Sequence, residues 1–181
     1  IELFKTMSFF ELILIGGIVL PFIEEIGFRL PMTFKPFYVG VSSSYFLFMI
    51  FNFYTDSKLI SASPNTIYAV AVCIAIGIIV TFVVSKKANQ IKTLWKNHFV
   101  WIFYGLTLFF GLFHITNYAP LTKSLLLVSP VLVLPQITSG IIIGYLRTKF
   151  GFLWGYFFHA LWNSMLISLV YILLSFVSKY I

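Results

Sequence analysis

Three short patterns in the chain combine residue types that could together hydrolyse a bond. They are Glu-Glu-x-x-x-Arg, Phe-x-x-x-His and His-x-x-x-Asn, and they correspond to Glu24, Glu25, Arg29, Phe110, His114, His159 and Asn163. A carboxylate in a low-dielectric pocket is a stronger base and can activate water. A neutral histidine or an asparagine N–H can donate a hydrogen bond to a developing oxyanion. Two histidines and a glutamate can also hold a zinc ion with an open coordination position.

The spacing within the first pattern places its three charged residues on two different faces of a helix. Glu25 and Arg29 are four residues apart, which is about one helical turn, so they can form an ion pair on one helix face. Glu24 projects about 100° away around the same helix and has no such partner. A charge cluster at a helix end, just before Pro31, is the alternative interpretation. One charged residue at the centre of a membrane helix costs about 2.5–3.5 kcal/mol, so we expect all three to face the interior of a bundle.

The spacing and number of the histidines also indicate a site. His159 and Asn163 are four residues apart and would share a helix face. A single transmembrane histidine is often a packing residue, but two of them with an amide and a glutamate pair indicate a site. His98 follows Asn97 at a segment end, where it is expected to be interfacial, and we assign it no role. The other common peptidase patterns, HExxH, GxSxG and GxGD, are absent from the sequence.

The composition predicts that these residues lie in a membrane protein. Hydrophobic residues make up 60% of the chain and charged residues 9%, and the mean hydropathy is +1.01. A soluble domain is about half apolar and about a quarter charged. Apolar runs of about 18 to 25 residues predict helices rather than barrel strands, because backbone polar groups in lipid must be paired internally.

The net charge of +7 comes mainly from basic residues at the ends of apolar runs. This arrangement is typical of membrane topology and anionic headgroups, and we therefore exclude nucleic acid as a partner. The single cysteine, Cys73, excludes an intramolecular disulfide and a cysteine-based metal site.

We expect an all-α, polytopic transmembrane bundle of about six spanning helices, forming a single domain over residues 1–181. The six apolar segments are Ser8–Leu30, Phe37–Tyr54, Thr66–Val84, His98–Asn117, Ser124–Leu146 and Phe152–Val177. Pro130 and Pro135 predict a kink in the fifth segment. Pro135 is followed by a polar run that consists of Gln136, Thr138, Ser139 and Gly140. A kinked structural helix is the simpler interpretation there, and a place where backbone meets a substrate is the other.

The distribution of basic residues predicts the orientation. The loops after the first, third and fifth segments hold Lys35, Lys86, Lys87, Lys92, Lys96, Arg147 and Lys149, and the opposite side holds Lys5, Lys58, Lys123 and Lys179. This excess predicts that the first set, including an amphipathic or irregular loop at 85–97, faces the cytoplasm. The chain begins at Ile1 without a signal-peptide pattern, which leaves room for native residues and further helices before it.

Together the three patterns resemble those of the CPBP family. This family contains the CAAX prenyl proteases and the bacteriocin-processing enzymes, which are also called Abi-type intramembrane peptidases. All three patterns occur in the family's order, each on its own hydrophobic segment, between about Pro21 and Met165. The resemblance implies an endopeptidase in which Glu24 activates the attacking water.

The resemblance also implies roles for the remaining residues. His114 and His159 would hold the water or a metal, and Asn163 would orient the site or stabilise the oxyanion. Glu25 and Arg29 would form a supporting ion pair, and Phe110 belongs to the second pattern. A divalent metal such as zinc, held by Glu24, His114 and His159, and a metal-free glutamate mechanism both remain open. The implied partners are the lipid bilayer and a membrane-bound or lipidated protein substrate, in the cytoplasmic membrane of a bacterium.

One feature departs from the family's usual pattern. Two additional hydrophobic segments and the lysine-rich loop separate Arg29 from His114. Hydropathy places Glu24 and His114 late in two antiparallel segments, and therefore at different depths. Helix tilt, a break at Gly16-Gly17 or Pro21, or offset helix ends could bring them together.

Two other functions remain open. A non-catalytic bacteriocin-immunity or binding protein could have the same fold. A proton-coupled transporter could use Glu and His as a relay, although the sequence shows no inverted repeat.

Overall fold

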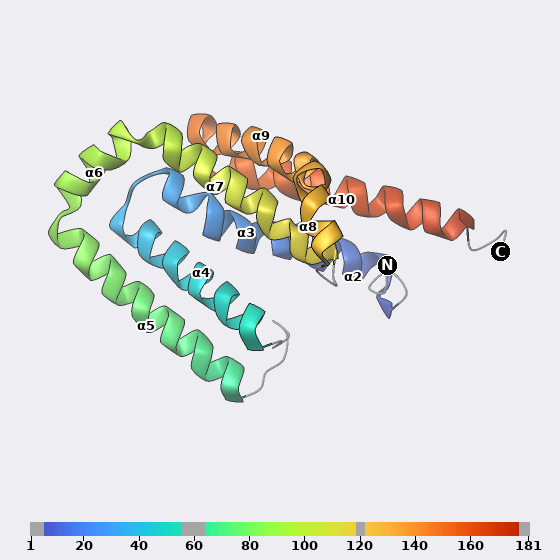
Figure 1. The fold of residues 1–181 in the computed structure, drawn as a ribbon, viewed down its shortest axis with the longest axis horizontal. Coiled ribbons are helices and arrows are strands. Elements are labelled where there is room, and N and C mark those ends of the chain that lie inside the picture. Colours follow the sequence, from blue (N-terminus) through green and yellow to red (C-terminus); the bar gives the residue numbers. More distant parts are fainter. Residues whose placement is uncertain (1–5, 56–63, 119–121, 178–181) are drawn as a thin grey trace.

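The computed structural model describes residues 6–55, 64–118 and 122–177, and every regular element within them is a helix (Figure 1). In chain order the elements are α2 (Phe9–Leu12), η1 (Ile13–Val19), α3 (Leu20–Phe28), η2 (Leu30–Met32), α4 (Pro36–Thr55), α5 (Pro64–Lys86), α6 (Ala88–Asn97), α7 (Phe99–Phe113), η3 (His114–Tyr118), α8 (Lys123–Leu132), α9 (Leu134–Phe150) and α10 (Phe152–Val177). Of the η elements, η1 is a π-helix, and η2 and η3 are short 3-10 helices.

Among the described residues, four helical stretches are long and apolar enough to cross a membrane. They are α4, α5, α7 with η3, and α10, and the bent pair of α8 and α9 makes a fifth if it is one span. The fold is therefore all-helical and fits an integral membrane protein, but the expected six spans are not confirmed. The first apolar segment is the exception, because α2, η1 and α3 divide it into pieces of four, seven and nine residues.

The predicted kink in the fifth segment is confirmed. The axes of α8 and α9 differ by 41° at a break between Leu132 and Leu134. Pro130 lies inside α8, and Pro135 lies in the first turn of α9. Proline has no N–H to continue the ladder of hydrogen bonds but is well tolerated in a first helical turn, so one helix stops and another starts.

Helices α3, α7, α9 and α10 pack around the centre of the molecule, and α4 and α5 form a hairpin beside them (Figure 1). The hairpin is held by close contact of two glycines. A Cβ built on Gly77 would lie 2.7 Å from the backbone oxygen of Gly40, and one built on Gly40 would meet the oxygen of Gly77. Small residues of this kind allow membrane helices to approach closely without a hydrophobic driving force between them.

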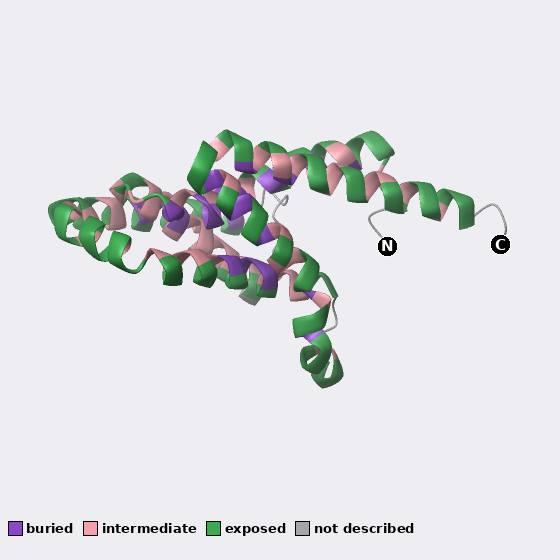
Figure 2. Cartoon of the chain, turned by 90° about the horizontal axis from the view of Figure 1, so that it is seen from above, coloured by how far each residue is buried: buried purple, intermediate pink, exposed green. Residues whose placement is uncertain are grey.

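The distribution of buried and exposed residues (Figure 2) is the one expected of a protein surrounded by lipid. The fully buried side chains include Glu25, Arg29 and Thr107, whereas many large apolar side chains on the outer helix faces, such as Ile78 and Phe82, are exposed. Polar groups in such proteins face the interior, because lipid cannot satisfy them. The interior is therefore where a functional site is expected.

The loops predicted to be basic gather at one end of the bundle (Figure 1). The lysine-rich loop forms the amphipathic helix α6. Trp95 of α6 donates a hydrogen bond of 2.9 Å to the backbone oxygen of Pro31. At the same end, the buried Arg147 of α9 donates one of 3.2 Å to the backbone oxygen of Arg29. These two bonds attach α6 and α9 to the chain that follows α3.

Candidate active site

The first pattern lies on α3 and continues to its C-cap at Arg29. Glu25 and Arg29 are both fully buried, and the ion pair predicted from their spacing is present, with 3.7 Å between Glu25 Oε1 and Arg29 Nε. The guanidinium carbon lies 4.4 Å from the centre of the Phe110 ring. Because 3.7 Å is too long for a good hydrogen bond, the cation is held mainly by charge and by the aromatic face.

His159 of α10 links the two glutamates. Its Nδ1–H donates a 3.0 Å hydrogen bond to Oε1 of Glu25, and its Nε2 lies 3.6 Å from Oε2 of Glu24. Glu25 therefore has a second function that its spacing to Arg29 did not predict, because it also fixes the orientation of the His159 ring. The Glu24 side chain remains 21% exposed, whereas that of Glu25 is 0% exposed.

The second pattern lies where α7 ends. The helix tightens at His114 into the 3-10 turn η3. His114 Nδ1 donates a 2.8 Å hydrogen bond to the backbone oxygen of Phe110, so Nε2 carries the lone pair when the ring is neutral. The Phe110 ring packs edge-on against both histidines, with ring centres 4.6 Å from His114 and 5.6 Å from His159. Phe110 thus contacts three members of the site, including Arg29.

Asn163 donates a long hydrogen bond of 3.5 Å from Nδ2 to the backbone oxygen of Gly16. This oxygen is available because of the π-helix η1. Leu20 donates its N–H to the backbone oxygen of Ile15, five residues back. In the same register the backbone oxygen of Gly16 would accept from Pro21, but proline has no N–H to donate. A break at this position was among the ways of bringing Glu24 and His114 together, and the structure realises it as a π-helix.

A cavity of about 320 Å³ connects these side chains. Its walls include all four residues predicted to carry the chemistry, which are Glu24, His114, His159 and Asn163. Glu24 and His114 therefore meet at one cavity, although hydropathy places both late in antiparallel segments. Eight residues, 25–32, follow Glu24 up to the end of η2, so Glu24 lies inside this helical stretch rather than at its end and can face the C-terminal end of α7.

Sequence reasoning gave no role to several other residues of the cavity wall. Gln136 and Ser139 come from α9, Asn117 comes from η3, and Gly16 comes from η1. Gln136 Oε1 is buried and has no hydrogen-bond partner among the described residues. The signal for this stretch was the polar run after Pro135, whose interpretation as a place that meets a substrate is compatible with its position on the cavity wall.

The expected metal ligands do not assemble into a three-ligand centre. Among the described residues, no group of three or more His, Cys, Asp or Glu side chains is placed to hold a metal ion. Glu24 and His159 are in contact, but a catalytic zinc site needs three protein ligands. The donor set, as it is placed, does not fit a zinc centre.

His98, to which no role was assigned, lies outside the cavity. It is exposed at the junction of α6 and α7, and its Nδ1 donates a 2.9 Å hydrogen bond to the backbone oxygen of Leu94. This is the same local bond that His114 makes to Phe110, so the two histidines differ in what surrounds them rather than in their own geometry.

In comparisons with known proteins, the chain matches no family model, no curated protein and no solved structure.

Proposed function

We propose that the chain is an intramembrane endopeptidase in which Glu24 activates water for attack on a peptide bond of a membrane-associated or lipidated protein. The observation that carries the proposal is the contact of Glu24 with His159 on the wall of a cavity that His114 and Asn163 also line. Three separate helical segments supply these groups. The resemblance of their patterns to the CPBP family supports the same activity.

The charge balance of the cluster suits a base that works in a membrane. Glu24, Glu25, Arg29 and His159 carry no net charge when both glutamates are ionised and His159 is protonated. They also carry none when the shared proton lies on Glu24 and His159 is neutral. A proton can therefore move within this coupled group without leaving an unpaired charge in the low-dielectric interior.

The reaction then follows from the positions of the side chains. Glu24 takes a proton from water, and the water oxygen adds to the carbonyl carbon of the substrate. His114 Nε2 accepts a hydrogen bond from the other O–H of the water, which stays on the oxygen, and so orients the water. Asn163 has a second N–H that can donate to the oxyanion, while its first remains on Gly16. As the C–N bond breaks, Glu24 returns its proton to the leaving amine.

The test is a cleavage assay on substrates found by comparing membrane proteomes of cells that express the wild type or Glu24→Gln. We expect Glu24→Gln to lower kcat/KM at least about a hundredfold, which is the usual contribution of a general base. His114→Gln should also lower it, whereas His98→Gln should leave it unchanged. These two substitutions form a matched pair, since both histidines make the same local hydrogen bond.

Full activity of purified Glu24→Gln would exclude Glu24 as the base. Protection against a bacteriocin that survives Glu24→Gln would instead favour the non-catalytic binding protein.

We also propose that the lysine-rich end faces the cytoplasm of a bacterial cell, because basic loops remain on that side. A cysteine placed on α6 as Gln90→Cys, in a Cys73→Ser background, should react with an impermeant maleimide only after the membrane is opened. Labelling of intact cells would reverse the orientation.

A further inference from the structure

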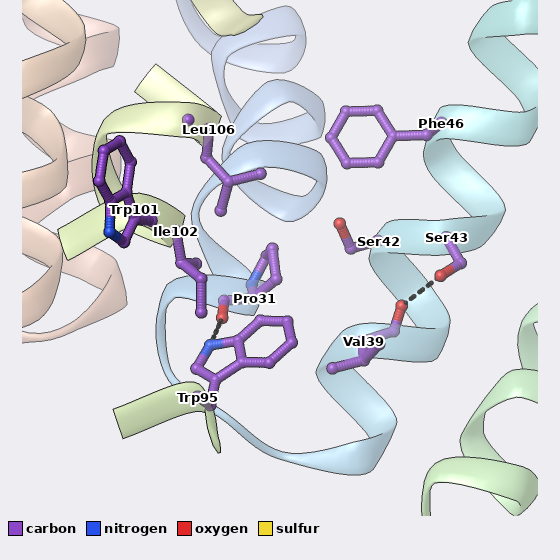
Figure 3. Close-up of a pocket in the computed structure, with 10 residues that line it drawn as sticks. Pro31, Val39, Ser42, Ser43, Phe46, Trp95, Trp101, Ile102 and Leu106 are labelled. Carbon is purple, nitrogen blue, oxygen red and sulfur yellow. Dashed lines mark hydrogen bonds between the residues drawn. The ribbon is translucent and has the colours of Figure 1, made fainter. Parts of the chain in front are cut away.

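A second cavity, of about 380 Å³, lies between α4, α6 and α7 and shares no wall residue with the site (Figure 3). We call it the α4–α7 crevice. Its wall is formed largely by apolar side chains, among them Val39, Phe46, Trp101, Ile102 and Leu106. Because these offer no polar partner, the crevice suits a hydrocarbon chain.

The two hydroxyl groups in the wall do not change this character. Ser42 donates to the backbone oxygen of Gly27 at 2.6 Å. Ser43 donates to that of Val39 at 2.8 Å (Figure 3). Both hydroxyls already have an acceptor. The interior of the crevice is therefore apolar in practice, and any specificity must come from the segments beside it.

Basic residues lie on the segments next to Trp95, one of the wall residues of the crevice. Trp95 is fixed by its hydrogen bond to Pro31. Lys92 and Lys96 are exposed on the same helix. Lys35, also exposed, follows Phe34, whose ring centre is 5.5 Å from that of Trp95.

Acidic side chains do not offset these lysines. The carboxylates of the described residues belong to Glu11 on α2 and to Glu24 and Glu25 in the site, so none is on α6 or in the chain around Lys35. A tryptophan beside exposed lysines is typical of the membrane interface, where amphipathic rings meet the headgroups. The segments beside the crevice therefore combine a tryptophan with exposed positive charge, and among the described residues no carboxylate lies on them.

We propose that the α4–α7 crevice binds one anionic phospholipid, with an acyl chain between α4 and α7 and the phosphate at Lys35, Lys92 and Lys96. Exposed lysines near a membrane surface each favour an anionic lipid, and three of them correspond to about a hundredfold preference over a neutral one. This inference does not depend on the proposed peptidase activity.

Gly105 of α7 makes the crevice testable. It is one of the wall residues, and a Cβ built on it meets nothing within 4 Å. Because Gly105 belongs to the crevice wall, we expect a larger side chain there to occupy part of the crevice. Gly105→Leu should therefore block the acyl chain and leave the fold intact.

The experiment is native mass spectrometry of the purified chain after exposure to equal amounts of phosphatidylglycerol and phosphatidylcholine with identical acyl chains. We expect the wild type to retain one phosphatidylglycerol and little phosphatidylcholine. Gly105→Leu should retain neither. The triple variant Lys35→Gln, Lys92→Gln, Lys96→Gln should lose the preference, by about a hundredfold in relative affinity.

The control is a second triple variant, Lys86→Gln, Lys87→Gln, Lys149→Gln, which removes the same charge from exposed lysines at the junction of α5 and α6 and near the C-terminal end of α9. It should keep the preference. Equal retention of the two lipids by the wild type would overturn the proposal. Full retention of phosphatidylglycerol by Gly105→Leu would overturn the crevice as the site, and loss of the preference in the control would assign it to general surface charge.

Discussion

The site and the lysine-rich end both carry charge in an apolar molecule, but they do so in opposite ways. In the site, two carboxylates, a guanidinium and an imidazole lie against one another in the interior. At the lysine-rich end, seven basic side chains gather, and all of them except Arg147 are exposed. A buried set must neutralise itself, whereas an exposed set keeps its charge for headgroups. Each member of the site therefore depends on the others, and the lysines are largely independent.

The largest effect on stability should come from Glu25→Gln, with Glu24→Gln as its matched control. Glutamine can still accept the hydrogen bond from His159, but it leaves the buried charge of Arg29 without its partner. We expect Glu25→Gln to lower the free energy of unfolding by about 3–5 kcal/mol, the usual cost of breaking a buried pair. The Glu24 side chain reaches the cavity, so Glu24→Gln should lose activity and little stability. Steric trapping in bicelles would measure both.

The double variant Glu25→Gln, Arg29→Met examines the cause of this loss. Removing both charges abolishes the uncompensated one, so the double variant should recover more than half of the stability that Glu25→Gln loses. If it were less stable than either single variant, the burial of an unpaired charge would not be the reason.

Alanine substitutions at two glycines, Gly140 in the site region and Gly105 in the crevice, should change stability by smaller amounts and in opposite directions. A Cβ on Gly140 would lie 3.1 Å from Phe110, 3.2 Å from Thr107 and 3.3 Å from Arg29, all of them buried. Gly140→Ala should therefore cost about 1 kcal/mol, because crowding of 1–3 kcal/mol outweighs the better helix propensity of alanine.

Gly105→Ala has open space and should gain about 0.5–1 kcal/mol from helix propensity alone. Unfolding of the two variants under the same conditions measures the contrast. Equal changes in both would show that the site region is no more tightly packed than the crevice.

The local parts of the site could be predicted from the sequence, because spacing along a helix fixes which side chains share a face. The Glu25–Arg29 pair and the kink near Pro135 are both of this kind. The long apolar runs likewise predicted an all-helical chain. In each case the interactions lie within a few residues of one another.

What could not be predicted depends on contacts between distant segments. No rule of spacing brings Glu25 to His159, 134 residues away. Hydropathy treated the first segment as one continuous helix, and so it missed the π-helix that exposes the oxygen of Gly16 to Asn163. It also missed Gln136 as part of the cavity wall, because a polar run after a proline is equally typical of a helix that is merely bent.

The smallest effect on stability should come from the double variant Lys92→Gln, Lys96→Gln at the lysine-rich end. Both side chains are exposed on α6, which is attached to the bundle through Trp95 rather than through its lysines. Substitutions at such positions usually change stability by no more than about 0.5 kcal/mol. In bicelles of neutral lipid the double variant should therefore unfold like the wild type.

When anionic lipid is added, the wild type should gain stability and the double variant should gain less, because only the wild type has its full set of lysines for the headgroup. A large loss already in neutral lipid would show that the lysines hold α6 in place, and the contrast between a self-neutralised site and an independent basic end would then fail.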